Sequence, residues 1–529
     1  MINAQKAQIQ GGLQAKPKEW AAEPASALKN LDLPVYVLRQ GQAVHLSNCG
    51  TLVAAGAKGS VELLAQAPAL DTSRLGDARF GQRFGATHAY FAGSMANGIS
   101  SAEMVIALGK AGYLASFGAG GLETQAVLAG LEQIQAALPD GPYAVNLIHS
   151  PNEAALESGA VDLFLKRGVK IIEASAYLDL TAQVVRYRVA GLAMEGGRVV
   201  AKNQVIAKVS RREVAERFMR PAPERFLGPL VEQGLITAEQ ASWAAQVPMA
   251  DAVSVEADSG GHTDNRPLVN LLPSLIALRN EIQAEMNYPE PILIGAGGGI
   301  GTPEAVLGAL SMGAAYIVTG SVNQACVESG TSDHVRTLLA QAAMADVIMA
   351  PASDMFEQGV KLQVLRRGTL FAMRAQKLYE WYSNCANIDE IPSAEREKLE
   401  KQIFQKPLEQ VWADCVDFFN RRDPAELAKA QANPKKKMAL IFRWYLGQSS
   451  HWAKAHTPGR EMDYQIWTGP AMGAFNDWVR GSSLEVVANR KVVAVAEELL
   501  RGAAYLARLR MLEWQGLSFD PALATYRPR

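Results

Sequence analysis

The chain has 529 residues, of which 49% are hydrophobic and 20% are charged, and its formal net charge is −1. A near-neutral chain of this length can bury a substantial core, but it has no general electrostatic attraction to nucleic acid or to an anionic membrane. Its function must therefore depend on a local site, within one large domain with additions or within two to three domains.

Residues 1–84 are polar and are interrupted by proline and glycine, with one clear strand predicted at residues 34–40 and little else of strong periodicity. This pattern predicts a small N-terminal subdomain. From about residue 87 the pattern changes, because short apolar runs are each followed by an amphipathic helical stretch.

Eight such units follow one another. The predicted strands lie at residues 87–93, 113–119, 143–148, 170–176, 204–210, 251–257, 291–297 and 314–321. Short buried runs that alternate with helices are typical of parallel strands joined by helical crossovers. Eight units over roughly 240 residues have the count and size of a (β/α)8 TIM barrel, so we predict an α/β fold with this barrel at residues 85–330. A doubly wound sheet is the alternative.

Two segments interrupt the series. Residues 191–203, GLAMEGGRVVAKN, predict a β excursion after the fourth unit, and residues 219–248 predict a helical insertion after the fifth.

Residues 331–529 are predicted to be helical throughout, as a long C-terminal helical region with clusters of aromatic residues. These aromatic residues either pack within the chain or form the seam of a homodimer. The basic run of Lys435, Lys436 and Lys437 follows Asn433 and Pro434, which favours a solvated linker or a helix start over a nucleic-acid patch.

A glycine-rich stretch, ILIGAGGGIGTPEAVLGALSMGAAYIVTGS, occupies residues 292–321. A dinucleotide-binding fingerprint requires GxGxxG, normally in the first βαβ unit. None of the frames that begin at Gly295, Gly297 or Gly299 has glycine at its last position, and the stretch lies near the end of the series. The sequence therefore argues against a Rossmann-type dinucleotide site.

The same stretch suits a phosphate site in a barrel. Phosphate groups commonly bind TIM barrels at the loops after strands seven and eight, where glycines let backbone N–H groups approach an anion. The residues concerned are Gly297, Gly298 and Gly299 after the seventh predicted strand and Thr319, Gly320 and Ser321 after the eighth. Both loops lead into predicted helices, whose N-terminal dipoles favour an anion. The alternative is that the glycines only permit tight turns.

The loop after the sixth strand, EADSGGHTDNRP, carries His262 directly after Gly260 and Gly261. A glycine pair frees the histidine to reach a bound ligand, and histidine can relay protons near neutral pH. A loop histidine by itself is more often only solvent-facing. Its position at a strand end of the barrel favours a catalytic role.

Other polar side chains follow neighbouring strands. Asn97 lies in the small-residue loop after the first strand, where a planar ring could lie against the backbone. Asn146 and His149 follow the third strand, and Glu173 and Ser175 follow the fourth.

Lys208 lies inside the fifth apolar strand. A buried lysine is costly unless it meets an anion. Two interpretations stay open: an ion pair with Glu173 or another carboxylate, or a cation that faces electron-rich atoms of a cofactor.

Several classes of site are not expected. No HxH, HExxH or carboxylate cluster has metal spacing, and no GxSxG motif of a serine hydrolase occurs. Cys49, Cys326, Cys385 and Cys415 are far apart and form no CxxC pair, which argues against a zinc site or a disulfide framework. The absence of a signal-peptide core and of a long apolar run predicts a cytoplasmic protein without a membrane span.

These loops together, MANGISSAEMVIALGKAGYLASFGAGGL, NLIHSPNE, IAKVS, EADSGGHTDNRP and the glycine-rich stretch, resemble the trans-acting enoyl reductases of polyunsaturated fatty acid and polyketide synthases, the PfaD family. That family lies within a wider group that contains FabK-type enoyl-carrier-protein reductases and nitronate monooxygenases. The barrel motifs match over residues 85–325, and the helical tail also resembles the PfaD type.

The resemblance implies an FMN-containing TIM barrel that reduces the α,β double bond of an enoyl thioester on an acyl carrier protein, with NADPH as hydride donor. Lys208 and His262 would be the catalytic residues: Lys208 would stabilise charge on the reduced ring, and His262, from the family's GGH motif, would donate a proton or orient nicotinamide or thioester. The implied FMN contacts are Gly298, Gly299, Gly320 and Ser321 at the phosphate, Gly260 and Gly261 closing over it, Ala96 and Asn97 behind the isoalloxazine, and Asn146 and Lys208 at its polar edge.

Three alternatives remain at this point. A nitronate monooxygenase would share the flavin site and the GGH loop, although the long helical tail disfavours it. A catalytically silent barrel could serve as a docking subunit of a synthase. A phosphosugar-binding barrel without flavin would leave the small-residue first loop unexplained.

Overall fold

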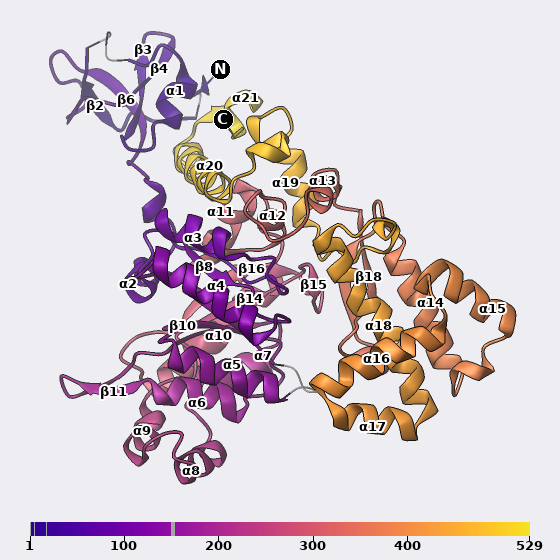
Figure 1. Ribbon diagram of the computed structural model, residues 1–529. Coiled ribbons are helices and arrows are strands. Elements are labelled where there is room, and N and C mark those ends of the chain that lie inside the picture. Colours follow the sequence, from indigo (N-terminus) through magenta and orange to yellow (C-terminus); the bar gives the residue numbers. More distant parts are fainter. Residues whose placement is uncertain (1, 5, 17, 19, 150–153, 529) are drawn as a thin grey trace.

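The computed structural model describes residues 2–4, 6–16, 18, 20–149 and 154–528 (Figure 1). At its centre eight parallel strands close into a barrel, each hydrogen-bonded to the strands before and after it, with β17 pairing back onto β7. The strands are β7 (Tyr90–Ala92), β8 (Leu114–Phe117), β9 (Ala144–Ile148), β10 (Ile171–Ser175), β13 (Gln204–Val209), β14 (Ala252–Glu256), β16 (Leu293–Gly297) and β17 (Tyr316–Thr319). All eight predicted strands are present, so the TIM barrel is confirmed and the doubly wound sheet is excluded.

Helices cover the outside of the barrel. They are α3 (Ala102–Lys110), α4 (Thr124–Ala137), α5 (Ala154–Lys166), α6 (Ala182–Ala190), α7 (Arg212–Met219), α10 (Leu268–Met286), α11 (Pro303–Ser311) and the short α12 (Ser321–Gln324). Before the barrel, α2 (Ala78–Phe84) places Phe80 and Phe84 against Phe91 and Tyr316 in a cluster with the first residues of the strands. The amino-terminal end of the barrel is therefore apolar, which leaves the carboxyl-terminal end for polar chemistry.

The two predicted interruptions are also present. The β excursion is the antiparallel pair β11 (Leu192–Glu195) and β12 (Arg198–Ala201). The helical insertion contains α8 (Glu224–Glu232) and α9 (Ala238–Trp243) between the fifth and sixth barrel strands.

The N-terminal region contains more strand than its sequence predicts. Five strands pair antiparallel in the order β4-β3-β6-β2-β5, with α1 (Pro24–Lys29) beside them. Their bounds are β2 (Gly11–Gln14), β3 (Val35–Gln40), β4 (Ala43–Ser47), β5 (Thr51–Val53) and β6 (Val61–Ala67). Strands as short as β2 and β5 show no sustained alternation, and they are stabilised by partners distant in the sequence.

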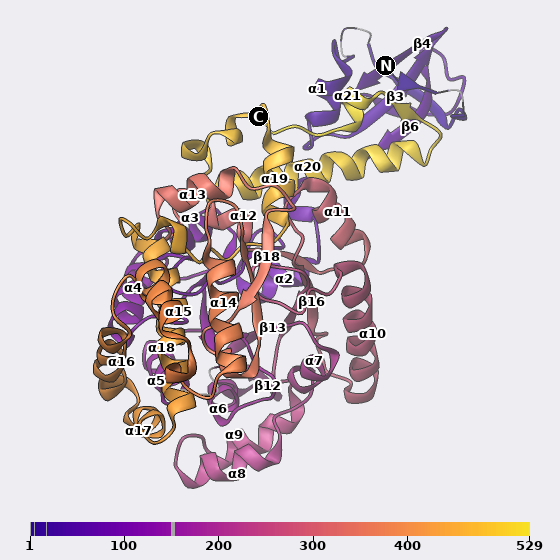
Figure 2. The ribbon, with the colours of Figure 1, turned by 90° about the vertical axis from the view of Figure 1, so that its right-hand side faces the viewer.

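The C-terminal region forms a mainly helical lobe beside the barrel (Figures 1 and 2). Its helices are α13 (Asp333–Ala340), α14 (Phe371–Asn384), α15 (Ser393–Lys398), α16 (Leu408–Arg422), α17 (Pro424–Ala432), α18 (Pro434–Ala455) and α19 (Ala471–Val479). Of these, α13 and α19 pack into the core of the barrel, whereas α14, α16 and α18 surround a core of their own. It is not helical throughout: β18 (Val347–Pro351) and β19 (Lys361–Leu365) form a hairpin, and β19 also pairs with β15 (Gly261–His262) from the barrel. A strand whose partner lies so far away in the chain leaves little signal in its local sequence.

The aromatic clusters of the lobe pack within the chain. Trp381, Tyr382, Trp412 and Trp444 lie against a core that includes Phe356, Phe404 and Phe442. The basic run begins α18 as a helix start, with Asn433 as its N-cap. Its side chains have partners within the chain: Lys435 bonds the Cys385 carbonyl, Lys436 pairs with Glu357 and Glu426, and the exposed Lys437 lies over Trp412. None of the four cysteines forms a disulfide in the described part of the chain.

A long helix, α20 (Val492–Glu513), joins the parts of the molecule. It packs on α11 and α3 of the barrel and on β6 and α1 of the N-terminal region. The chain then passes through β20 (Ser518–Phe519) and α21 (Pro521–Ala524), and β20 pairs antiparallel with β1 (Ile2–Asn3). Among the described residues, none of the helices combines the length and apolar character needed to cross a bilayer.

Candidate functional site at the barrel mouth

The predicted site residues come together at the carboxyl-terminal end of the barrel strands. In the ladder, Glu256 at the end of β14 is paired with Gly297 at the end of β16, and Gly297 is paired with Val318, next to Thr319, in β17. The ends of strands six, seven and eight are thus neighbours, as the sequence predicts for a shared binding site.

Two glycines of the loop after β16 have a backbone conformation that favours glycine. Gly298 and Gly299 have φ values of 85° and 76°, in the left-handed region that favours glycine. A Cβ atom at Gly298 would lie 2.6 Å from the backbone of Ala257, whereas one at Gly299 or Gly320 would meet no atom within 4 Å. Gly298 therefore packs loop seven onto loop six, and Gly299 and Gly320 leave open space beside the backbone.

Thr319 differs from the rest of this group. Its side chain is buried, donates to the Tyr90 hydroxyl at 2.7 Å and accepts from the Asn323 amide at 2.9 Å. The Thr319 side chain thus stabilises the loop through buried hydrogen bonds. The next two residues, Gly320 and Ser321, are partly exposed. The helix that follows, α12, is a single turn, so its dipole contributes less to an anion site than the sequence suggests.

His262 contacts two residues of the C-terminal lobe, Asp354 and Leu362. Its Nε2 atom lies 3.1 Å from Oδ1 of Asp354, and its backbone pairs with Leu362 of β19. Burial alone would lower the pKa of His262, but the hydrogen bond and charge of Asp354 raise it above the usual value. The side chain is 41% exposed, so the imidazole can exchange protons with solvent.

The loop before His262 is fixed by a buried amide. The Nε2 atom of Gln363 donates to Oδ1 of Asp258 at 2.9 Å and to the Ser259 carbonyl at 2.8 Å. The Gln363 side chain thus stabilises the loop on which Gly260, Gly261 and His262 lie.

Lys208 makes the ion pairs that its sequence position suggests. Its Nζ atom lies 3.5 Å from Glu256 and 3.9 Å from Glu173. Burial disfavours its charge, but the two carboxylates outweigh burial and raise the pKa of Lys208. Glu173 is completely buried and accepts the backbone N–H of Ser94, in the first loop, at 2.7 Å. The ion pair does not exclude a role toward a cofactor, because the Lys208 side chain is 20% exposed.

Asn146 of β9 is a further buried polar residue of the predicted site. Its amide donates to Oγ of Ser175 at 2.8 Å and to the Glu173 carbonyl at 3.2 Å. His149, directly after the same strand, pairs with Glu157 at 3.0 Å and stacks on Tyr177, which suits a structural role. The rest of that motif, residues 150–153, lies outside the described residues.

The first loop carries Ala96 and Asn97. Both are partly exposed, and Asn97 has φ of 59°. The backbone of Asn97 donates to the Gly120 carbonyl at 2.7 Å, and its own carbonyl accepts from Lys454 of α18 at 2.6 Å. Its amide also lies 3.4 Å from Oγ of Ser450. The loop is therefore anchored to the second strand end and to the C-terminal lobe.

Four residues of the site escaped sequence reasoning: Asp354, Gln363, Ser450 and Lys454. All belong to the C-terminal lobe, which follows the barrel in the sequence. Nothing in their local patterns indicates contact with the barrel mouth.

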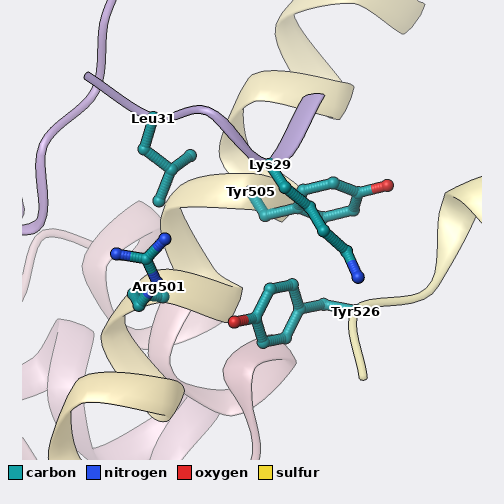
Figure 3. Close-up of a pocket in the computed structure, with 5 residues that line it drawn as sticks. All are labelled: Lys29, Leu31, Arg501, Tyr505 and Tyr526. Carbon is teal, nitrogen blue, oxygen red and sulfur yellow. The ribbon is translucent and has the colours of Figure 1, made fainter. Parts of the chain in front are cut away.

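One small pocket in the described part of the chain is lined by Asn97, Ser450, Lys454, Gln465 and Trp467 among others, and so lies where the first loop meets the lobe. Another lies between Lys29, Leu31, Arg501, Tyr505 and Tyr526 (Figure 3). Its lining contains no predicted site residue.

No cluster of three or more potential metal ligands occurs in the described ranges of the chain.

Comparison with protein families gives three matches. The model of nitronate monooxygenase matches residues 83–402, and that of the N-terminal domain of fatty acid synthase subunit PfaD matches residues 23–69. The inserted helical domain of [acyl-carrier-protein] S-malonyltransferase matches residues 385–464, in the helical lobe.

Curated relatives are similar along most of the chain. One subunit of the polyunsaturated fatty acid synthase of Thraustochytrium sp. is 48% identical over 94% of this chain and 34% of its own length. Polyketide biosynthesis protein PksE of Bacillus subtilis is 44% identical over 83% of this chain and 57% of its own length. The chain therefore spans between one third and three fifths of these two relatives.

A solved structure gives the same grouping. The enoyl reductase domain of MlnA, from the macrolactin biosynthesis cluster of Bacillus amyloliquefaciens, is 38% identical and superposes with a TM-score of 0.80. The alignment covers 84% of this chain and 100% of that domain. The chain belongs to the nitronate monooxygenase family of TIM barrels and, within it, to the group that carries a PfaD-type N-terminal domain.

Proposed function

We propose that this chain is an FMN-dependent enoyl reductase that uses NADPH to reduce the α,β double bond of an enoyl thioester carried on an acyl carrier protein. The observation that carries the proposal is the convergence of the GGH loop, Lys208 and the two glycine loops at one barrel mouth, in a chain 38% identical to an enoyl reductase domain over that domain's whole length.

The residues present fit FMN. Gly261, Gly299 and Gly320 have open space where a Cβ would lie, so their backbones can be approached by a phosphate group. The buried Oε1 atom of Glu173 accepts no hydrogen bond within the described part of the chain, which leaves it free to accept one from a ligand. Lys208 supplies a cation beside it.

When bound, FMN would supply hydride transfer between NADPH and the β-carbon of the enoyl thioester. Lys208 would place positive charge at the polar edge of the ring and favour the form that carries negative charge. His262 would hold a proton at Nε2 or Nδ1, with Asp354 favouring the protonated imidazole, and would release it toward the α-carbon directly or through solvent.

The helical lobe supports the proposal of a carrier-protein substrate. Residues 385–464 match a helical domain described from an acyl-carrier-protein transferase. A small free substrate needs no such added surface. We therefore propose that the carrier protein approaches the barrel mouth from the side of the lobe.

The family match also favours a second candidate, a nitronate monooxygenase. The test that separates the two is anaerobic reduction of the purified holoprotein by NADPH or NADH, followed by addition of an enoyl carrier-protein thioester or of a nitronate. Re-oxidation of the flavin by the enoyl thioester, with formation of the saturated product, is expected. Re-oxidation by the nitronate alone would contradict the proposal. A colourless protein that FMN cannot reconstitute would instead indicate a docking subunit.

A further inference from the structure

A segment of the C-terminal lobe, residues 468–471, lies directly on the loops predicted to hold the FMN phosphate. Thr468 is completely buried, and Ala471 begins α19. Figure 1 shows α19 beside α12, and the two helices are in contact. The segment therefore reaches the barrel mouth although its sequence gives no indication of a ligand.

Residues 468–471 contact the GGH loop, residues 260–262, through backbone atoms on both sides. A Cβ atom at Gly260 would lie 2.6 Å from both N and Cα of Thr468, closer than real side-chain contacts come. In the opposite direction, a Cβ at Gly469 would lie 3.0 Å from the backbone N of Gly260. Two glycines thus permit the two loops to touch, and neither position has room for a larger residue.

The segment also contacts both of the other loops. The backbone N–H of Gly469 donates to Oγ of Ser321 at 3.1 Å. A Cβ at Gly301, just after the glycine run, would lie 2.3 Å from the Ala471 carbonyl oxygen. Residues 468–471 therefore touch all three loops of the predicted phosphate site.

The surroundings suit an anion. The Oγ atom of Ser259 is buried without a hydrogen-bond partner among the described residues. The first turn of α19, a helix of nine residues, contains no acidic residue, so its N-terminal partial charge is not neutralised there. Gly299 and Gly320 keep open space on the barrel side.

We infer that residues 468–471 form the third wall of the FMN phosphate site, so that cofactor binding requires this segment as well as the barrel loops to be in place. This inference rests on the proposed flavin chemistry and adds to it a set of residues outside the barrel strands and their loops. Because a ligand that binds only the arrangement with the segment in place stabilises it, FMN should in turn protect the contact between residues 468–471 and the barrel.

The test uses the full-length protein with bound FMN removed, and variants Gly260→Ala, Gly469→Ala and Ser321→Ala. Gly308→Ala is the matched control, because Gly308 lies in α11 and a Cβ there would meet no atom within 4 Å. FMN affinity is measured by quenching of flavin fluorescence, and folding of each apoprotein by circular dichroism and thermal unfolding.

We expect Gly260→Ala and Gly469→Ala to weaken FMN binding at least tenfold, Ser321→Ala severalfold, and Gly308→Ala less than twofold. FMN should also slow limited proteolysis around residues 468–471 in the parent and much less in Gly469→Ala. If Gly260→Ala does not fold, the FMN affinities of Gly469→Ala and Ser321→Ala test the inference. Folded variants that bind FMN within twofold of the parent would overturn the inference and leave the proposed function intact. A parent that binds no FMN would overturn both.

Discussion

The Nζ atom of Lys454 donates a 2.6 Å hydrogen bond to the backbone carbonyl of Asn97, across 357 positions of sequence. Lys454 has no carboxylate partner in the described part of the chain, and burial lowers its pKa. Its interaction with the first loop is thus one of the few that this ammonium group makes. The hydrogen bond holds Asn97, which has the left-handed conformation and belongs to the loop that we propose as a flavin contact.

Replacement of Lys454 by methionine should loosen this loop. A hydrogen bond from a charged group contributes about 1.5–3 kcal/mol, so FMN affinity should fall by about tenfold or more. Fluorescence titration of the apoprotein measures this. Lys110→Met, at the exposed end of α3, is the control and should bind FMN normally. Equal affinities in the two variants would contradict a role for the Lys454 bond.

Removal of the Lys208 ammonium should destabilise the protein. Lys208→Met leaves Glu173 buried beside it without its cation, and breaking a buried pair in this way costs about 3–5 kcal/mol. Urea unfolding of the apoprotein measures the loss. The double variant Lys208→Met/Glu173→Gln should regain much of the stability but not the reductase activity. A double variant as unstable as the sum of its single changes would show that the pair is not coupled.

The pH dependence of catalysis should report the contact between His262 and Asp354. Because Asp354 raises the pKa of His262, a step that needs the protonated imidazole should slow as the pH rises through this raised pKa. In Asp354→Asn that decline should move to lower pH, toward or below about 6.5, the usual value for histidine. The measurement is kcat/KM for the enoyl thioester across the neutral pH range. An unchanged profile would remove His262 from the proton-transfer step.

The contact between His262 and Asp354 should also make the free energy of unfolding depend on pH. A raised pKa in the folded state means that the protonated pair stabilises the fold fully below about pH 6.5 and that this contribution is lost as the pH rises through the folded pKa. The difference in unfolding free energy between the parent and Asp354→Asn should therefore be larger in mildly acidic than in alkaline buffer. Urea unfolding of both proteins in the two buffers measures it, and a difference that grows with pH would contradict the assignment.

Arg508 of α20 should be critical for the N-terminal region. Its completely buried guanidinium donates to the carbonyls of Leu28, Asn30 and Leu33, at 3.1, 2.8 and 2.8 Å, and burial lowers its pKa to about 10. Arg508→Met leaves these carbonyls unsatisfied and should cost about 3 kcal/mol. Thermal unfolding measures it. Arg510→Met, which removes only an exposed pair with Glu513, should change stability by less than about 1 kcal/mol.

The barrel could be predicted from sequence because each strand and its following helix are local patterns. Glycine at positions 298 and 299 could be assigned to a loop for the same reason. By contrast, β18 and β19 lie in a region for which the sequence predicts helix, since their extended form depends on β15 and on each other. Tertiary pairing of this kind overrides local propensity.

Only the site residues that belong to the barrel could be predicted from the sequence. His262 and Lys208 lie at or near strand ends, where position in the repeat indicates function. Asp354, which raises the pKa of His262, and Gly469, which bonds Ser321, come from a lobe whose packing against the mouth depends on contacts distant in the sequence. Their residue types alone, an aspartate before a short helix and a glycine before a proline, are common features of turns.

The antiparallel pairing of Ile2 with Phe519 brings the first and last strands of the chain together. Each of the two strands has only two residues and, in the described part of the chain, pairs with no strand except the other. Fraying of either end would therefore release the opposite end as well.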